Sequence, residues 1–118
     1  MATYEDISID QGTDITVRLE LNNTDGSAKD LTNHNVAAKL KKSYTSVDSA
    51  DIVTFSSQIP TPASGGIINL SLTNTQTDAM KAGRWVYDVE ISFQDSDANT
   101  IVERILEGQA TVTPSVTR

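Results

Sequence analysis

The chain has 118 residues and no cysteine, and nine Lys plus Arg against sixteen Asp plus Glu give a formal net charge of −7. This length fits one domain, and the lack of cysteine excludes disulfides, thiolate metal sites and a cysteine nucleophile. The acidic balance argues against nucleic acid as a partner, because phosphate backbones bind basic surfaces.

Short β-branched runs alternate with turn clusters along the chain, which is typical of a sandwich or barrel. The first expected strand covers residues 4–10, and the second covers residues 14–21. On both strands apolar side chains occupy alternate positions and therefore share one face. The inward set is Ile7, Ile9, Ile15, Val17, Leu19 and Leu21. Asp25-Gly26 is the expected centre of the next turn.

Three further strands are expected in the middle of the chain, at residues 35–42, 52–59 and 67–72. The first of these also fits a short helix, because Ala, Lys and Leu favour one, although the alternation favours a strand. A turn rich in proline and glycine covers residues 60–66. The inward residues are Val36, Ala38, Leu40, Val53, Phe55, Ile68, Leu70 and Leu72.

The period of two is lost over residues 73–82, where the composition predicts one or two turns of helix. Thr73 or Thr75 is the expected cap, and Gly83 is the expected end. The chain then enters its central strand, which alternates large apolar residues with polar ones. The large residues form the expected centre of the core: Trp85, Tyr87, Val89, Ile91 and Phe93.

The alternation over residues 100–107 fits two opposite phases, with either Ile101 and Ile105 or Val102 and Leu106 inward. Both faces are partly apolar, so the pattern leaves the phase open.

Gly108 is expected to end that strand before a last short one. Together these patterns predict an all-β, antiparallel β-sandwich of about seven strands, with one short helix before the Trp85/Tyr87 strand. It forms a single domain over residues 1–118, with terminal arms at about 1–6 and 114–118.

Catalytic motifs are missing from the sequence. The only histidine, His34, lies in a polar run without the activated serine that a nucleophilic triad requires, and we expect a solvated surface residue. The HExxH, GxGxxG and GxxxxGK signatures are also missing. We therefore expect no enzyme activity, no catalytic residue and no cofactor.

Residues 95–99, DSDAN, have the opening of a calcium-binding loop. Thr100 replaces the glycine expected at the sixth position, and Leu106 replaces the glutamate expected at the twelfth. Asp and Asn also favour hairpin turns, so we interpret the segment as a turn rather than a metal site.

Lys39, Lys41 and Lys42 form the one concentration of positive charge. They suit either an acidic partner or the protection of an edge strand against aggregation, and we favour edge protection. The residues selected as candidate partner contacts are Tyr4, Lys39, Lys41, Lys42, Val116 and Arg118.

An ordered set of motifs resembles small β-sandwich proteins of tailed bacteriophages. The set is ISIDQGTD at 7–14, the DG and DLT turns at 25–32, GIINLSL at 66–72, AGRWVYDVE at 82–90 and EGQATVTPSVTR at 107–118. The chain is similar to the N-terminal domain of phage baseplate upper proteins and to Ig-like modules of capsids and tails. The resemblance implies an Ig-like sandwich without catalytic residues.

That resemblance implies an accessory virion subunit, either a capsid decoration or cement protein or a component of the tail, neck or baseplate. Its partners are then other virion proteins, bound in multiple copies by symmetry. The start of the sequence lacks a signal peptide and no apolar run approaches a membrane span, so we expect synthesis in a host cytoplasm and no membrane partner. The alternative is a carbohydrate-binding or adhesin-like sandwich.

Overall fold

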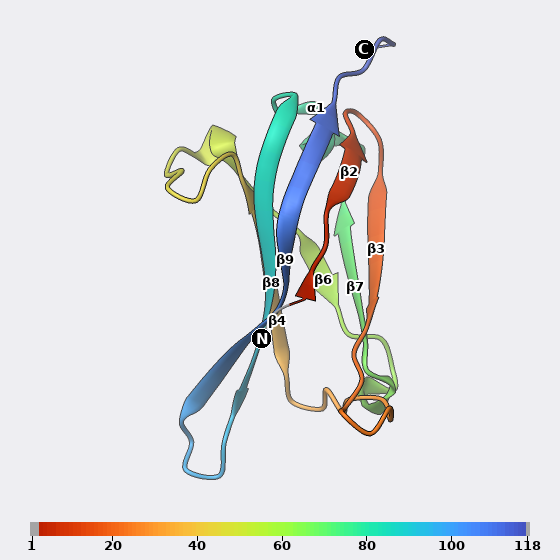
Figure 1. Cartoon of the computed structure of the whole chain (residues 1–118), viewed down its shortest axis with the longest axis vertical. Helices are drawn as coiled ribbons and strands as arrows, with labels where there is room; N and C mark the ends of the chain where they lie inside the picture. The colour runs from red at the N-terminus through yellow and green to blue at the C-terminus, as the bar shows by residue number, and fades with distance from the viewer. Residues whose placement is uncertain (1–2, 118) are drawn as a thin grey trace.

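Strand β8 (Gly83–Gln94) carries the side chains around which the two sheets pack, as its period of two predicts. Its buried residues are Trp85, Tyr87, Val89 and Ile91. The computed structural model describes residues 3–117. Figure 1 shows β8 beside β9 along most of the length of the molecule.

The larger sheet contains six strands within the described residues, in the order β1–β9–β8–β4–β5, and β2 also pairs with β9. The pairs are antiparallel except for β1 and β2, which both run parallel to β9. The strands are β1 (Thr3–Tyr4), β2 (Ile7–Asp10), β4 (Asn35–Lys41), β5 (Ile52–Thr54) and β9 (Thr100–Thr113).

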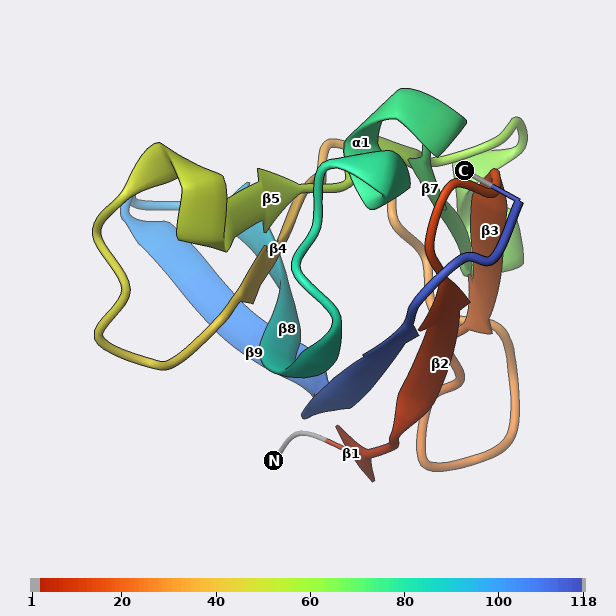
Figure 2. The same ribbon diagram turned by 90° about the horizontal axis from the view of Figure 1, so that it is seen from above.

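The smaller sheet is antiparallel, with the order β3–β7–β6. Its strands are β3 (Ile15–Glu20), β6 (Ser56–Gln58) and β7 (Ile67–Leu72). The remaining elements are helix α1 (Asn74–Asp78) and two 3-10 helices, η1 (Ser49–Asp51) and η2 (Ala63–Gly65). Figure 2 separates the layers, with β3 and β7 on one side and β4, β8 and β9 on the other.

The predicted β-sandwich is confirmed, but residues 3–117 contain nine strands rather than about seven. The N-terminal run divides into β1 and β2, and both pair with β9. The run at 52–59 divides at Phe55: β5 pairs with β4 in the larger sheet, whereas β6 pairs with β7 in the smaller sheet. Phe55, at which the chain passes from one sheet to the other, is buried.

The core fills the space between the sheets. Its largest fully buried apolar side chains are Ile9, Leu31, Leu40, Ile68, Leu70, Leu72, Met80, Trp85, Val89, Ile91 and Val112. Ile15, Val17 and Leu19 pack against this cluster but are only partly buried, because β3 lies at a sheet edge. Phe93 lies outside the cluster, against the His34 ring, which corrects its expected place in the core.

Helix α1 is capped by Thr73, the first of the two predicted caps. The Thr73 hydroxyl accepts a hydrogen bond of 3.2 Å from the Gln76 N–H, and Gln76 Oε1 accepts one of 2.9 Å from the Thr73 N–H. This reciprocal pair is a capping box, and it satisfies two backbone donors at the start of the helix. The helix ends at Asp78, well before the expected Gly83.

β9 continues through Gly108, where the sequence suggested that the strand ends. A Cβ atom at this position would lie 1.9 Å from the Glu5 carbonyl oxygen, so glycine here permits a close approach of the N-terminal segment. Thr3 and Tyr4 form β1, so this part of the expected N-terminal arm belongs to the larger sheet.

A β-bulge resolves the two competing phases of β9. The β8–β9 register shifts just after Val89, which leaves Ile105 as an extra residue. On one side of the bulge Leu106 faces the core, whereas Ile101 and Val102 on the other side are both exposed. Neither phase therefore holds over the whole segment.

Candidate functional site

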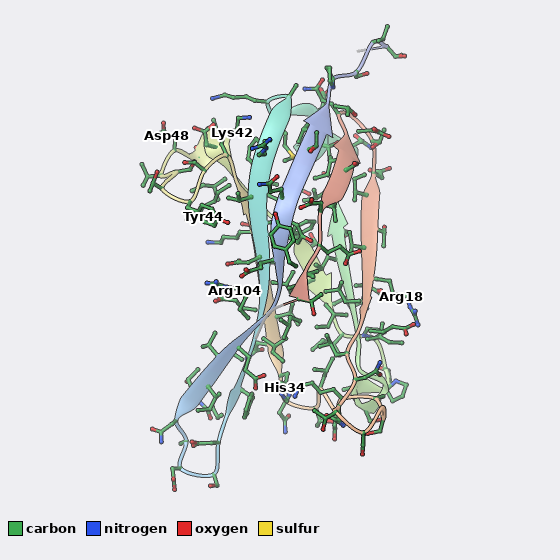
Figure 3. The ribbon with its side chains drawn as sticks, viewed as in Figure 1. Arg18, His34, Lys42, Tyr44, Asp48 and Arg104 are labelled. Carbon is green, nitrogen blue, oxygen red and sulfur yellow. The ribbon has the colours of Figure 1, made fainter. Side chains whose placement is uncertain are left out.

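The outer face of the larger sheet carries a shallow groove of about 510 Å³. Besides the buried Ala38 and Tyr87, it is lined by residues that alternate with the buried ones on three strands. These are Ala37, Lys39 and Lys41 of β4, Val86, Asp88 and Glu90 of β8, and Arg104 and Glu107 of β9. Tyr44 contributes from the loop after β4. Figure 3 shows Tyr44 and Arg104 on the same side of the molecule.

Arg104 lies between two carboxylates in this groove. Its Nε is 3.3 Å from Asp88 Oδ2, and its Nη1 is 3.3 Å from Glu107 Oε2. All three side chains are partly exposed, so water and salt screen the pairs, and each contributes at most about 1 kcal/mol. The two ion pairs hold the Arg104 guanidinium in the groove.

The three lysines do not lie on an edge strand, so the interpretation of edge protection is wrong. β4 pairs with β5 on one side and with β8 on the other at Lys39 and Lys41. Both of these side chains line the groove, and neither forms an ion pair with any residue in 3–117. Lys42 is used internally: its Nζ donates to the Arg84 carbonyl oxygen at 3.1 Å and lies 5.8 Å from the centre of the Trp85 ring.

Two exposed tyrosines belong to the same face. Tyr44 is 81% exposed, and Tyr4, which is paired with Glu107 across β1 and β9, is 60% exposed. Desolvation, and after it the Asp6 carboxylate and Tyr44, raise the pKa of Tyr4 above its ordinary value of 10.0.

The structure thus brings three predicted partner contacts to one surface: Tyr4, Lys39 and Lys41. Val116 is exposed in the C-terminal segment, and Arg118 lies outside the described residues. Tyr44 and Arg104 were missed by sequence reasoning. An isolated aromatic in a polar loop was the available signal for Tyr44, whereas only the register across the bulge places Arg104 in the groove.

The turn of the β8–β9 hairpin is closed by Asp95. Its Oδ1 accepts hydrogen bonds of 2.9 Å from the backbone N–H groups of Asp97 and Asn99. The predicted turn is confirmed, and its carboxylate is occupied by backbone donors. Within residues 3–117, no group of three or more His, Cys, Asp or Glu side chains is arranged to hold a metal ion.

His34 is partly buried rather than fully solvated. Its ring centre lies 4.8 Å from that of Phe93, and its Nδ1 is 3.0 Å from the Thr32 carbonyl oxygen. Figure 3 places His34 at the start of β4, beside the base of the projecting hairpin. The histidine therefore packs where the hairpin leaves the sandwich.

No family model and no curated protein match the sequence. Among solved structures, murine CRIg is 16% identical, with 92% of each chain covered and a TM-score of 0.53. AggA, the major subunit of aggregative adherence fimbriae type I from Escherichia coli, is 11% identical over 92% of this chain and 89% of its own, with a TM-score of 0.41. The likeness to CRIg shows an Ig-like β-sandwich fold. The described residues contain no helix long and apolar enough to cross a membrane.

Proposed function

We propose that the chain is a non-enzymatic structural subunit of a tailed-bacteriophage virion, which docks on a larger symmetric assembly through the outer face of its larger sheet. The observation that carries the docking face is the exposure of Tyr44 in the groove with Lys39, Lys41 and Arg104, together with the exposed Tyr4, which pairs with Glu107 of the same groove. Aromatic residues and arginine are enriched where proteins bind proteins. The ordered sequence motifs support the bacteriophage part of the proposal.

The chemistry of this face defines the surface that would bind it. Lys39 and Lys41 line the groove without an ion pair to any residue in 3–117, so they suit carboxylates on a partner. The exposed rings of Tyr4 and Tyr44 provide apolar area with a polar end. The fitting partner is therefore a protein surface, part of a capsid or of a tail, that has an apolar centre and places carboxylates at Lys39 and Lys41.

Co-sedimentation tests this role. The purified chain is mixed separately with capsids and with tails of the phage that encodes it. Pelleting with capsids identifies a head decoration or cement protein, whereas pelleting with tails identifies a component of the tail, neck or baseplate. A chain that remains in the supernatant with both overturns the virion assignment.

Variants of the docking face test the surface separately. We expect Lys39→Glu and Tyr44→Ala to weaken pelleting, because they remove a cation and the most exposed ring of the groove. Arg18→Glu is the matched control, since Arg18 is exposed on β3 of the smaller sheet and pairs there with Glu20. Equal pelleting of all three variants would show that a different surface docks.

A carbohydrate-binding or adhesin-like module is the second candidate, and the exposed Tyr44 ring beside a polar groove favours it. Trp85 is fully buried, so its fluorescence should be blue-shifted and insensitive to sugars in either case. Binding of the chain to immobilised glycans, lost in Tyr44→Ala, would support this candidate if the chain pellets with neither capsids nor tails.

A further inference from the structure

The stretch Thr100–Arg104 of β9 forms an open edge of the larger sheet. One side of it pairs with β8, but β1, on the other side, pairs with β9 only from Leu106 onward. No other strand within residues 3–117 pairs with this stretch. An open edge presents backbone N–H and C=O groups that another strand can pair with.

The bulge at Ile105 separates this open edge from the covered part of β9. A bulge bends its strand and increases the local twist. Figure 1 shows the β8–β9 hairpin leaving the body of the sandwich and projecting away from the smaller sheet. The open edge therefore lies on an arm that another molecule can approach.

This edge is protected at one end only, where Glu103 and Arg104 precede the bulge. Along β3, Arg18 and Glu20 form an exposed ion pair, and β5 and β6 are only three residues long each. Charges and short lengths of this kind discourage unwanted strand pairing. Toward the turn, the open edge has no charge and exposes Ile101 (36%) and Val102 (56%) on its two faces.

We propose that this edge pairs with the same edge of a second copy of the chain, antiparallel and about a two-fold axis at Val102. A two-fold axis perpendicular to a sheet keeps each side chain on its own face, so the central residue meets its own equivalent. With the axis at Val102, the two valines meet each other, Thr100 lies opposite Arg104, and Ile101 lies opposite Glu103.

Neighbouring registers are less favourable. An axis at Glu103 or at Arg104 would place two like charges directly opposite each other, which destabilises strand pairing. An axis at Ile101 would leave part of the open edge unused. The register centred on Val102 uses the whole of Thr100–Arg104 and opposes no like charges.

The pairing would join two hairpins into one continuous sheet. Such a contact is far smaller than the interface of a stable dimer, so it is weak in dilute solution. Copies held side by side on an assembly have a high effective concentration, and the same contact then links neighbours. The inference rests on the proposed function, because only copies docked side by side on an assembly would use this contact. The contact itself can be tested with the isolated chain.

The test uses the absence of cysteine from the chain. At millimolar concentration under mild oxidation, we expect Val102→Cys to form a disulfide-linked dimer, because the axis brings the two side chains together. Thr16→Cys is the matched control, since Thr16 is also exposed and lies on the edge strand β3. It should remain monomeric under the same conditions.

Sedimentation equilibrium of the unmodified chain and of Val102→Lys provides the second measurement. We expect a concentration-dependent dimer for the former and a monomer for the latter, because two lysines would face each other. Circular dichroism checks that the variant is folded. A monomeric unmodified chain at millimolar concentration, or equal cross-linking of the two cysteine variants, overturns the pairing. Either result leaves co-sedimentation to decide the proposed function.

Discussion

The Tyr87 hydroxyl donates a hydrogen bond of 2.5 Å to the Glu5 carbonyl oxygen and so joins the centre of β8 to the segment between β1 and β2. Gly108 lies opposite Tyr87 on β9 and leaves room for this segment. The N-terminal strands are therefore held by a side-chain bond as well as by their backbone pairing with β9.

Replacing Gly108 should displace that segment. In Gly108→Ala the added Cβ would lie 1.9 Å from the oxygen and 2.7 Å from the carbon of the Glu5 carbonyl, which are backbone atoms. We expect the free energy of unfolding to fall by about 1–3 kcal/mol in urea titrations. Gly65→Ala is the control, because no atom lies within 4 Å of its added Cβ. Equal stability of the two variants would contradict the close approach.

The Tyr87 hydroxyl should make stability sensitive to alkaline pH. Burial, followed by the Glu5 and Asp6 carboxylates, raises the pKa of Tyr87 from 10.0 to about 12. The un-ionised hydroxyl therefore favours the folded state, a contribution that is fully present below pH 10.0 and lost as the pH rises toward 12.

Tyr87→Phe checks this prediction. The variant should lose about 1 kcal/mol at neutral pH with the hydrogen bond. Its unfolding free energy should then decline less than that of the unmodified chain between pH 10.0 and 12. Parallel declines in this range would show that Tyr87 does not cause the alkaline loss.

The hydroxyl of Thr77 should stabilise the contact between α1 and the β2–β3 turn. Thr77 is fully buried, and its Oγ1 accepts from the Gly12 N–H at 3.1 Å and donates to the Thr13 carbonyl oxygen at 2.7 Å. Thr77→Val preserves the shape but removes these bonds and a third one, of 3.2 Å, to the Asn74 carbonyl oxygen. We therefore expect a loss of about 1–3 kcal/mol by urea unfolding. Thr77→Ser keeps the hydroxyl and should lose less. A larger loss in the serine variant would indicate packing instead.

The turn before β4 should respond to acid. Hydrogen bonds from the Thr32 hydroxyl (2.5 Å) and N–H (2.9 Å) lower the pKa of Asp30 below 3.8. The ionised carboxylate therefore favours folding above pH 3.8, and this contribution is lost as the pH falls through the lower, folded-state pKa.

Asp30→Asn measures that contribution. The unmodified chain should be slightly more stable than the variant at neutral pH, and the difference should vanish well below pH 3.8 in urea titrations at each pH. Asp48→Asn is the control, since Asp48 lies in the exposed loop before η1. A difference that is independent of pH would contradict the assignment to Asp30.

Local sequence patterns predicted individual strands well but not their partners. Alternation identified the inward faces of β3, β7 and β8, because side chains two apart on a strand share a face. It did not show that the run at 52–59 changes sheets at Phe55. The change of sheet depends on which distant strand forms backbone hydrogen bonds with each half of the run. The lysines were misplaced for the same reason, because edge position is a property of the sheet.

The sequence by itself determined a β-sandwich with its core on the Trp85 strand, because composition and the period of two are local properties. Only the tertiary structure decided the parallel pairing of β1 and β2 with β9, the bulge at Ile105, and the gathering of Tyr4 and Tyr44 on one face. These features depend on backbone hydrogen bonds between residues far apart in the chain. No local period of the sequence encodes such bonds.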